Sequence, residues 1–298
     1  MHIGLMADPW SGTLGDIVNE VEFAGRANLH TYWLAQVWRF DAMTLIPHLA
    51  QAAPTLRFAT GVVASWLRHP MTLATQALTT NLLTADRFTL GVGLMHQPIM
   101  EGMMEIPFDR PVGHMREYLD VLMPLLDSRQ ADASSSTVSY HGPVDVPDAP
   151  TCNVLLAALG PQMLALAGSR TAGTVTWMTG PKTIGSHIVP TISDAAHKAG
   201  RPAPRIAALV PIHITDDTRG ASAAAAEKLA LYGQLPSYRH MLDREGFEGP
   251  ADAALIGNEA FVREQIGAYA AAGVTDLGLA ILAGDADRDR TRELIASL

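Results

Sequence analysis

The most constraining feature of this chain is a regular alternation of short apolar segments with longer amphipathic patterns along its 298 residues. The apolar segments are continuous rather than alternating, as expected of strands that are buried on both faces. The expected strands are residues 2–8, 31–37, 56–64, 87–96, 153–159, 173–178, 205–214 and 276–282. Helical periodicity separates them and is clearest over 16–29, 42–53 and 70–84.

Helices between buried strands imply parallel pairing, and eight such units favour a (β/α)8 TIM barrel over an open doubly wound sheet. Residues 1–298 are therefore expected to form one barrel domain. Two segments interrupt the alternation. Residues 128–150 are polar and rich in Pro and Gly, and we expect an insertion loop there rather than a linker between domains. Residues 215–256 read as a helical excursion with an Ala-rich helix near 221–232.

Composition excludes several classes of protein. A formal net charge of −9 without dense runs of Lys or Arg argues against a general nucleic-acid binder. The single cysteine, Cys152, excludes a disulfide framework and a cysteine-rich zinc site, and we expect a packed thiol. The N-terminus lacks a signal-peptide pattern, and no apolar stretch reaches the roughly 18–20 residues that span a bilayer. We therefore expect a cytoplasmic protein without a membrane partner.

Two turns are candidates for a phosphate site, because barrel chemistry lies at the carboxyl ends of the strands. Gly160-Pro161 separates an expected strand from a helix, and Thr179-Gly180-Pro181, followed by Lys182, repeats the arrangement one strand later. Free backbone N–H groups at such helix starts bind anions. Each turn alone is as well explained as an ordinary helix start, but two in successive loops favour a phosphate-bearing ligand.

Two other kinds of chemistry have no motif in the chain. The 11 histidines are scattered, without a His-x-His or His-Glu-x-x-His pattern, so no metal site is expected. A serine hydrolase is not expected either, because there is no Gly-x-Ser-x-Gly elbow.

Residues 68–93, "RHPMTLATQALTTNLLTADRFTLGVG", resemble the bacterial luciferase-like monooxygenase superfamily. The family phrase is Arg-His-Pro, a helix, and then Gly/Asp-Arg-Phe-x-Leu-Gly-Val-Gly; here Asp86 stands where glycine is commoner. The resemblance continues through 157–177 and 268–282, and so covers nearly the whole chain. "VTWMTGPKTI" and "FATGVVAS" are most similar to the branch that uses coenzyme F420, an 8-hydroxy-5-deazaflavin hydride carrier.

The resemblance implies an oxidoreductase that transfers hydride between F420 and a small organic substrate. It implies a luciferase-like barrel, commonly a homodimer, with a cis peptide bond at Gly61–Val62 behind the deazaflavin ring. The residues expected around this cofactor are Gln36, Gly61, Val62, Ala64, Gly93, Leu159, Gly160, Pro161, Thr179, Gly180 and Lys182. Leu159 to Pro161 and Thr179-Gly180 would face the phosphate, whereas Lys182 would meet an anionic group, the acidic tail of the cofactor, or solvent.

The reacting centre departs from the family pattern. Related dehydrogenases carry Glu three residues after the glycine that corresponds to Gly93, and this chain has His96. Histidine titrates near neutral pH, so His96 is the best candidate for the proton that accompanies hydride transfer; the alternative is a loop histidine that only hydrogen-bonds. Many members end the second strand with Asp-His, where this chain has Gln36-Val37. Valine cannot transfer a proton, whereas Gln36 can still hydrogen-bond the ring edge.

Several large side chains near strand ends are candidates for an apolar substrate pocket, although each is also a candidate core residue. They are Trp38, Trp66, Met95 and Trp177. Two alternatives to the F420 enzyme remain open. One is an FMN-dependent luciferase-like monooxygenase, and the other is a non-catalytic flavin- or deazaflavin-binding barrel.

Overall fold

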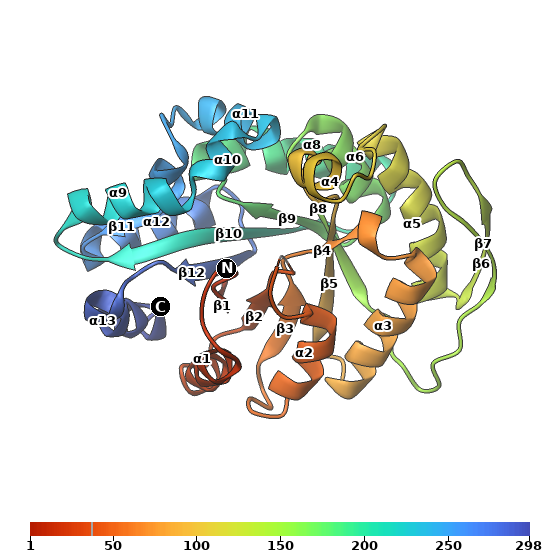
Figure 1. Ribbon diagram of the computed structural model, residues 1–298, viewed down its shortest axis with the longest axis horizontal. Helices are drawn as coiled ribbons and strands as arrows, with labels where there is room; N and C mark the ends of the chain where they lie inside the picture. The colour runs from red at the N-terminus through yellow and green to blue at the C-terminus, as the bar shows by residue number, and fades with distance from the viewer. Residues whose placement is uncertain (37) are drawn as a thin grey trace.

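The computed structural model describes residues 1–36 and 38–298. Within these residues, eight parallel strands close into a barrel, in the order β12–β1–β2–β3–β5–β8–β9–β10 and back to β12 (Figure 1). The strands are β1 (His2–Met6), β2 (Thr31–Leu34), β3 (Arg57–Thr60), β5 (Phe88–Gly93), β8 (Asn153–Ala157), β9 (Gly173–Trp177), β10 (Arg205–Ile214) and β12 (Asp276–Ile281). The expected (β/α)8 barrel is confirmed.

Helices follow the barrel strands and cover the outside of the sheet (Figure 1). The longer ones are α1 (Leu14–Arg26), α2 (Ala42–Leu49), α3 (Pro70–Leu83), α5 (Pro111–Asp127), α6 (Pro161–Arg170), α8 (Val189–Lys198), α12 (Glu259–Ala271) and α13 (Asp285–Ala296). Shorter elements are α4 (Gln97–Met103), α7 (Pro181–Thr183), a π-helical turn (Ile184–Ile188) and the 3-10 turns Ser65–Leu67 and Pro250–Ala253. Local sequence sets these starts: Thr13 and Asp16 form a capping box at α1, and Pro70 occupies the first turn of α3.

The barrel has two layers of buried side chains. A small inner cluster fills its lumen and consists of Met6, Trp33, Ala59, Leu155, Val175, Ala207, Leu209 and Ala280. A much larger cluster lies between the strands and the surrounding helices. The lumen is thus packed, so a ligand has room only beyond the strand ends.

The third expected strand, 56–64, is interrupted by a bulge. β3 ends at Thr60, β4 (Val63–Ala64) continues beside β5, and the Gly61–Val62 bond between them is cis, as the resemblance predicts. The bulge is held against the end of β2, because Gly61 N–H donates to Leu34 O at 2.8 Å and Gln36 N–H donates to Val62 O at 3.3 Å.

The polar segment 128–150 contains an antiparallel hairpin, β6 (Gln130–Ser134) with β7 (Ser139–Pro143), which extends beside α5 (Figure 1). The second interruption, expected over 215–256, carries α9 (Thr218–Lys228), α10 (Ala230–Gln234) and α11 (Pro236–Glu245). We call residues 215–254 the helical insertion. It leaves the barrel after β10 and returns through β11 (Leu255–Gly257), which pairs with the end of β10. Figure 1 shows α10 and α11 on the same side of the barrel as α4.

The described part of the chain has no helix that combines the length and the hydropathy needed to cross a bilayer.

Candidate functional site

A cavity of about 410 Å³ lies at the carboxyl end of the barrel, between the strand ends and the helical insertion. This volume is near the lower end of the range of roughly 300–1,000 Å³ that is usual for small-molecule sites. The predicted residues on its wall are Gln36, Gly61, Val62, Ala64, Gly93, His96, Leu159 and Gly160. Pro161, Thr179, Gly180 and Lys182 are not on the wall, so the fold gathers the predicted ring-side residues and leaves much of the predicted phosphate side apart.

The bulge at Gly61–Val62 is packed tightly against β5. A Cβ atom at Gly93 would lie 2.6 Å from the Val62 side chain, and one at Gly91 would overlap the carbonyl oxygen of Thr60. Thr60 also brackets Gly91, because its hydroxyl donates to Gly91 O and accepts from Gly91 N–H, both at 2.8 Å. The two glycines therefore make room for the protein's own bulge as well as for the cavity beyond it.

His96 enters the cavity from the loop after β5. Met95 before it has a φ of 73°, a conformation that is uncommon outside glycine, and His96 itself is the N-cap of α4. Its ring stands edge-on to two tyrosine rings, with centroid distances of 6.1 Å to Tyr232 and 5.8 Å to Tyr238. Burial lowers the pKa of His96 below 6.5, so its imidazole is neutral at pH 7.

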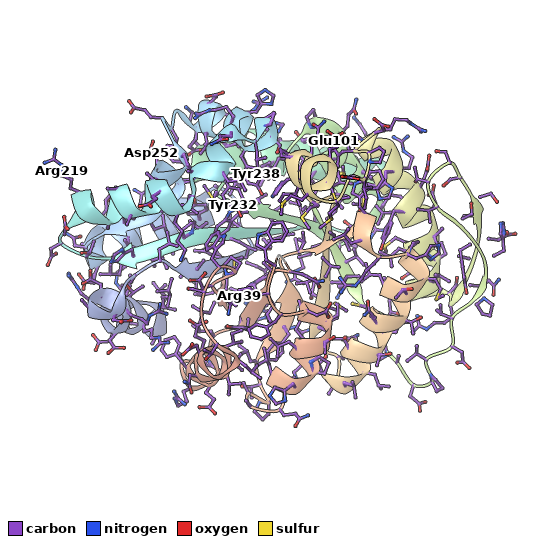
Figure 2. All side chains as sticks on the ribbon, viewed as in Figure 1. Arg39, Glu101, Arg219, Tyr232, Tyr238 and Asp252 are labelled. Atoms are coloured by element: carbon purple, nitrogen blue, oxygen red, sulfur yellow. The ribbon has the colours of Figure 1, made fainter. Side chains whose placement is uncertain are left out.

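Tyr232 and Tyr238 were not predicted as site residues. They lie on α10 and α11, and their ring centroids are 5.1 Å apart (Figure 2). Burial raises the pKa of Tyr232 to about 12, and burial together with neighbouring Tyr232 raises the pKa of Tyr238 further. Both hydroxyls are thus neutral donors at pH 7. The only sequence signal was the recurrence of aromatic residues in a helical excursion, which does not reveal the strand end that they face.

One polar atom of the cavity wall, Gln36 Oε1, is buried and has no hydrogen-bond partner among the described residues. Buried polar groups are normally paired, so an acceptor is left here for a guest molecule. The prediction that Gln36 bonds a cofactor edge is compatible with this free acceptor. Val37, which stands where many relatives carry the catalytic histidine, lies outside the described residues.

The first predicted phosphate turn is open. Gly160 is the N-cap of α6, no side chain caps this helix, and a Cβ atom at Gly160 would meet no described atom within 4 Å. Gly160 and Leu159 line the cavity, and His187 Nε2 lies 2.8 Å from Leu159 O, which fixes the turn against the following helical segment. The free N–H groups of the first α6 turn suit an anion at the cavity rim.

The second predicted phosphate turn carries a carboxylate of the chain itself. Glu245 at the end of α11 accepts from Lys182 N–H at 2.9 Å and from Thr183 N–H at 2.6 Å, which are the first free amides of α7. Lys182 Nζ in turn donates to Glu245 O at 3.3 Å. The two helix ends therefore cap each other. The roles of Thr179, Gly180 and Lys182 in phosphate binding stay a prediction, with the added condition that Glu245 must leave this turn.

The large side chains near the strand ends divide into two groups. Trp38, Met95 and Trp177 line the cavity. Trp66 is not on the cavity wall; its ring stacks on His114 at a centroid distance of 3.6 Å, and burial lowers the pKa of His114 to about 4. Trp66 therefore packs against its neighbours and does not line the substrate pocket, which is the second of the two roles considered for it.

Neither metal nor thiol chemistry has a site in the described residues. They contain no group of three or more His, Cys, Asp or Glu side chains that could hold a metal ion. Cys152 is buried and unpaired, and burial raises its pKa to about 12, in keeping with the expected packed thiol.

Comparison with known proteins gives a consistent family pattern. Residues 2–254 match the sequence family described as luciferase-like monooxygenase. A Mycobacterium tuberculosis protein, provisionally named a coenzyme F420-dependent oxidoreductase, is 25% identical, and the alignment covers 97% of each chain.

Solved structures share the fold. The coenzyme F420-dependent tetrahydromethanopterin reductase from Methanopyrus kandleri superposes with a TM-score of 0.83 at 19% identity, over 99% of this chain and 97% of that chain. The oxygenating constituent of 3,6-diketocamphane monooxygenase from Pseudomonas putida, solved with FMN, superposes with a TM-score of 0.76 at 18% identity, over the same shares of the two chains.

Proposed function

Because this chain belongs to the luciferase-like monooxygenase family, we propose that it is an oxidoreductase that transfers hydride between coenzyme F420 and a small organic substrate. The observation that carries the proposal is the gathering of the predicted ring-side residues on one cavity wall at the carboxyl end of the barrel. The mycobacterial relative that matches over its whole length supports F420 as the cofactor.

The residues present fit a deazaflavin. Gly61 and Val62 would lie behind the ring, with Ala64 and Gly93 beside it, and the free Oε1 atom of Gln36 would accept from the ring edge. The open start of α6 at Leu159, Gly160 and Pro161 would receive the phosphate. When bound, F420 supplies a carbon-centred hydride donor or acceptor, and the protein supplies binding, orientation and proton transfer.

His96 is proposed to exchange the proton with the substrate oxygen. It is the wall residue whose side chain can gain or lose a proton near neutral pH, because burial raises the pKa values of Tyr232 and Tyr238 far above this range and Lys228 is paired with Asp8. Edge contacts with Tyr232 and Tyr238 position the imidazole at the cavity wall.

FMN is the second candidate cofactor, since a solved structure with the same fold binds it. The two cofactors share a tricyclic ring and a phosphate, so the same wall residues serve either. The homodimer and the cytoplasmic location are implied by the family resemblance alone and stay predictions.

The test is a fluorescence titration of the purified protein with F420 and, separately, with FMN. We expect micromolar binding of F420 and at least about tenfold weaker binding of FMN. Preferential FMN binding would support the monooxygenase alternative, and binding of neither would contradict the proposal. If F420 binds but no hydride transfer to any carbonyl compound is detected in a substrate screen, the non-catalytic alternative is favoured.

A further inference from the structure

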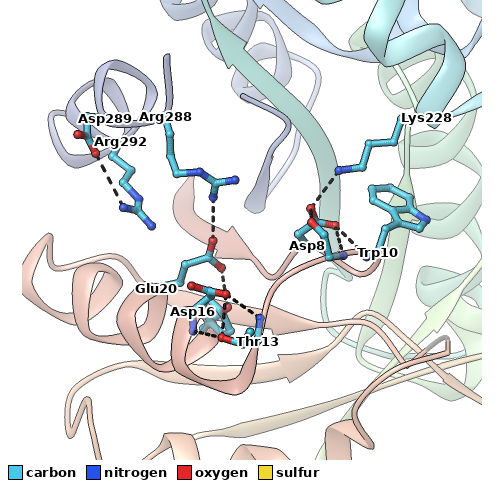
Figure 3. A network of polar contacts seen from close by, with 11 residues as sticks. Asp8, Trp10, Thr13, Asp16, Glu20, Lys228, Arg288, Asp289 and Arg292 are labelled. Atoms are coloured by element: carbon cyan, nitrogen blue, oxygen red, sulfur yellow. Dashed lines mark hydrogen bonds and ion pairs between the residues drawn. The ribbon is translucent and has the colours of Figure 1, made fainter. Parts of the chain in front are cut away.

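The cavity wall is almost without net charge. Its ionisable side chains are His96, Lys228, Tyr232 and Tyr238, and its described lining residues include no carboxylate. Lys228, on α9, donates to Asp8 Oδ2 at 3.0 Å, and its ammonium lies 5.0 Å from the Trp10 ring centroid (Figure 3). The one permanent cation of the wall is therefore already paired, so a charged guest would lose hydration without gaining a free counter-ion.

The wall on the side of the helical insertion is a connected set of aromatic rings. Trp10 after β1, Trp177 at the end of β9, Tyr232 on α10 and Tyr238 on α11 follow one another at centroid distances of 6.2, 6.1 and 5.1 Å. We call these four residues the aromatic wall. Their planes are inclined to one another by 50 to 68°, the tilted and edge-to-face arrangement in which aromatic rings attract one another.

The aromatic wall and the bulge line the same cavity but come from different parts of the fold. Gly61 and Val62 come from the barrel, whereas Tyr232 and Tyr238 come from the insertion that covers its mouth, and both groups line one cavity. His96 contacts both tyrosine rings. A substrate held between the cofactor ring and the insertion would thus meet the aromatic wall on one side, with His96 at its margin.

We propose that the substrate is an uncharged, planar aromatic carbonyl compound, or the corresponding alcohol, bound against the aromatic wall. This inference rests on the proposed F420-dependent function. In the reducing direction, the carbonyl carbon receives a hydride, which carries two electrons, from the reduced deazaflavin, and the carbonyl oxygen receives a proton from His96. The products are the alcohol and the oxidised deazaflavin, and solvent restores the proton of His96. In the oxidising direction, the alcohol loses the hydride to the oxidised deazaflavin and the proton to His96.

The test compares three ketones that differ in one property each, by calorimetric titration of the full chain with and without saturating F420. Acetophenone is planar and uncharged, cyclohexyl methyl ketone has similar size without a π system, and 4-acetylbenzoate adds a negative charge. A single aromatic pair changes affinity by between about twofold and tenfold. We expect acetophenone to bind about tenfold more tightly than either of the other two ketones.

The variants Tyr232→Phe and Tyr232→Leu separate the ring from the hydroxyl. Tyr232→Phe should keep the preference for acetophenone over cyclohexyl methyl ketone, and Tyr232→Leu should reduce it severalfold. Tyr140→Leu, on the β7 hairpin away from the cavity, is the matched control and should leave the preference unchanged. A circular-dichroism melt of each variant identifies any that fails to fold, and Trp177→Leu is the second variant in that event.

Three results would overturn the inference: equal or tighter binding of the cyclohexyl ketone, tighter binding of the benzoate, or an unchanged preference in folded Tyr232→Leu and Trp177→Leu. These outcomes are distinct from failure of the proposed function. If F420 does not bind but the free protein still prefers acetophenone, the cofactor proposal fails and the ligand class stands. If F420 binds and the preference is absent, the cofactor proposal stands and the proposed ligand class fails.

Discussion

His96 is the proposed proton donor and acceptor, and its protonation state is expected to set the rate in each direction of the reaction. Because burial lowers its pKa below 6.5, neutral imidazole dominates at pH 7 and is ready to accept a proton. Protonated imidazole, which reduction of a carbonyl requires, becomes more abundant as the pH falls through that lowered pKa. The groups that face it are Tyr232 and Tyr238, and both remain neutral over this range.

We therefore expect kcat/KM for reduction to fall as the pH rises through the His96 pKa, and kcat/KM for oxidation to rise. His96→Gln should lower kcat by about 100-fold, within the range for loss of a general acid–base group, and abolish this inflection. The measurement is a pH–rate profile in both directions from pH 5 to 8. His141→Gln, on the exposed hairpin, is the control, and an inflection that survives in His96→Gln would assign the proton to another group.

Glycine is required at position 91 by the backbone of Thr60 on the adjacent strand rather than by a ligand. A Cβ atom there would overlap Thr60 O, so Gly91→Ala forces the bulge away from β5. We expect a loss of about 1–3 kcal/mol in the free energy of unfolding. Gly102→Ala in α4 is the matched control: its Cβ would meet no described atom within 4 Å, and the change should be neutral or stabilise by up to about 1 kcal/mol. Urea denaturation of both variants distinguishes the two cases.

At the scale of elements, α7 and α11 hold each other through Glu245. A carboxylate at the last residue of α11 is unfavourable for the dipole of that helix, but it is favourable at the first turn of the segment that begins with α7. The Glu245 carboxylate therefore accepts the backbone N–H groups of the second predicted phosphate turn when no phosphate is bound there.

Glu245→Gln removes the charge at this turn and keeps the length of the side chain. We expect a loss of about 1 kcal/mol in the free energy of unfolding, as for a weakened N-cap, together with severalfold tighter F420 binding, because the phosphate no longer competes with a carboxylate. Thermal melts and the F420 titration measure the two effects. Glu248→Gln, exposed just beyond α11, should change neither. Unchanged F420 affinity would place the phosphate at the Gly160 turn alone.

The elements themselves could be predicted well, because buried parallel strands have continuous apolar sequences. Such sequences can be recognised without knowing which segments the strand contacts. The span 205–214 is observed without change, whereas the expected strand 2–8 ends at Met6, where the chain enters the loop that carries Asp8 and Trp10. The hairpin β6–β7 was expected only as an insertion loop. Its alternating exposure gives little hydrophobic signal.

The candidate site was harder to predict, because it depends on contacts between distant segments. His96 and Gln36 could be proposed from their positions after strands. The contacts of Tyr232, Tyr238 and Glu245 join residues that lie tens to more than a hundred positions apart in the chain, and no local pattern encodes them. The cis bond at Gly61–Val62 was predicted by family resemblance and not by periodicity.

At the scale of the whole molecule, Arg205 links three strands at the amino-terminal end of the barrel, through an ion pair to the neighbouring strand β12 and a hydrogen bond to β5, which is not its neighbour. Arg205 on β10 donates to Asp276 on β12 at 2.8 Å and to Thr89 on β5 at 3.3 Å. Burial alone would raise the pKa of Asp276, but the hydrogen bonds and charge of Arg205 outweigh it, and the pKa is lowered. The ionised pair thus stabilises the closed barrel.

Asp276→Asn should lower the free energy of unfolding by about 2–3 kcal/mol at pH 7, somewhat less than for a fully buried pair because Arg205 is 30% exposed. Since the native pKa is lowered, the contribution of Asp276 is present above about pH 4 and is lost as the pH falls through the native value. The difference between wild type and variant should therefore shrink below pH 4. Urea denaturation over this pH range, with Asp194→Asn as the exposed control, tests the expectation.

The helical insertion begins and ends on two paired strands, since Thr215 N–H donates to Gly257 O at 3.0 Å and β11 pairs with the end of β10. Its two ends are therefore fixed side by side whatever lies between them. We therefore expect that the segment can be exchanged for that of a relative, or shortened to a tight connection, without changing the order of the barrel strands. Because Tyr232 and Tyr238 lie within it, we expect an exchange of this one segment to change the substrate side of the cavity, while Gln36, Gly61 and Gly93 keep their places on the barrel.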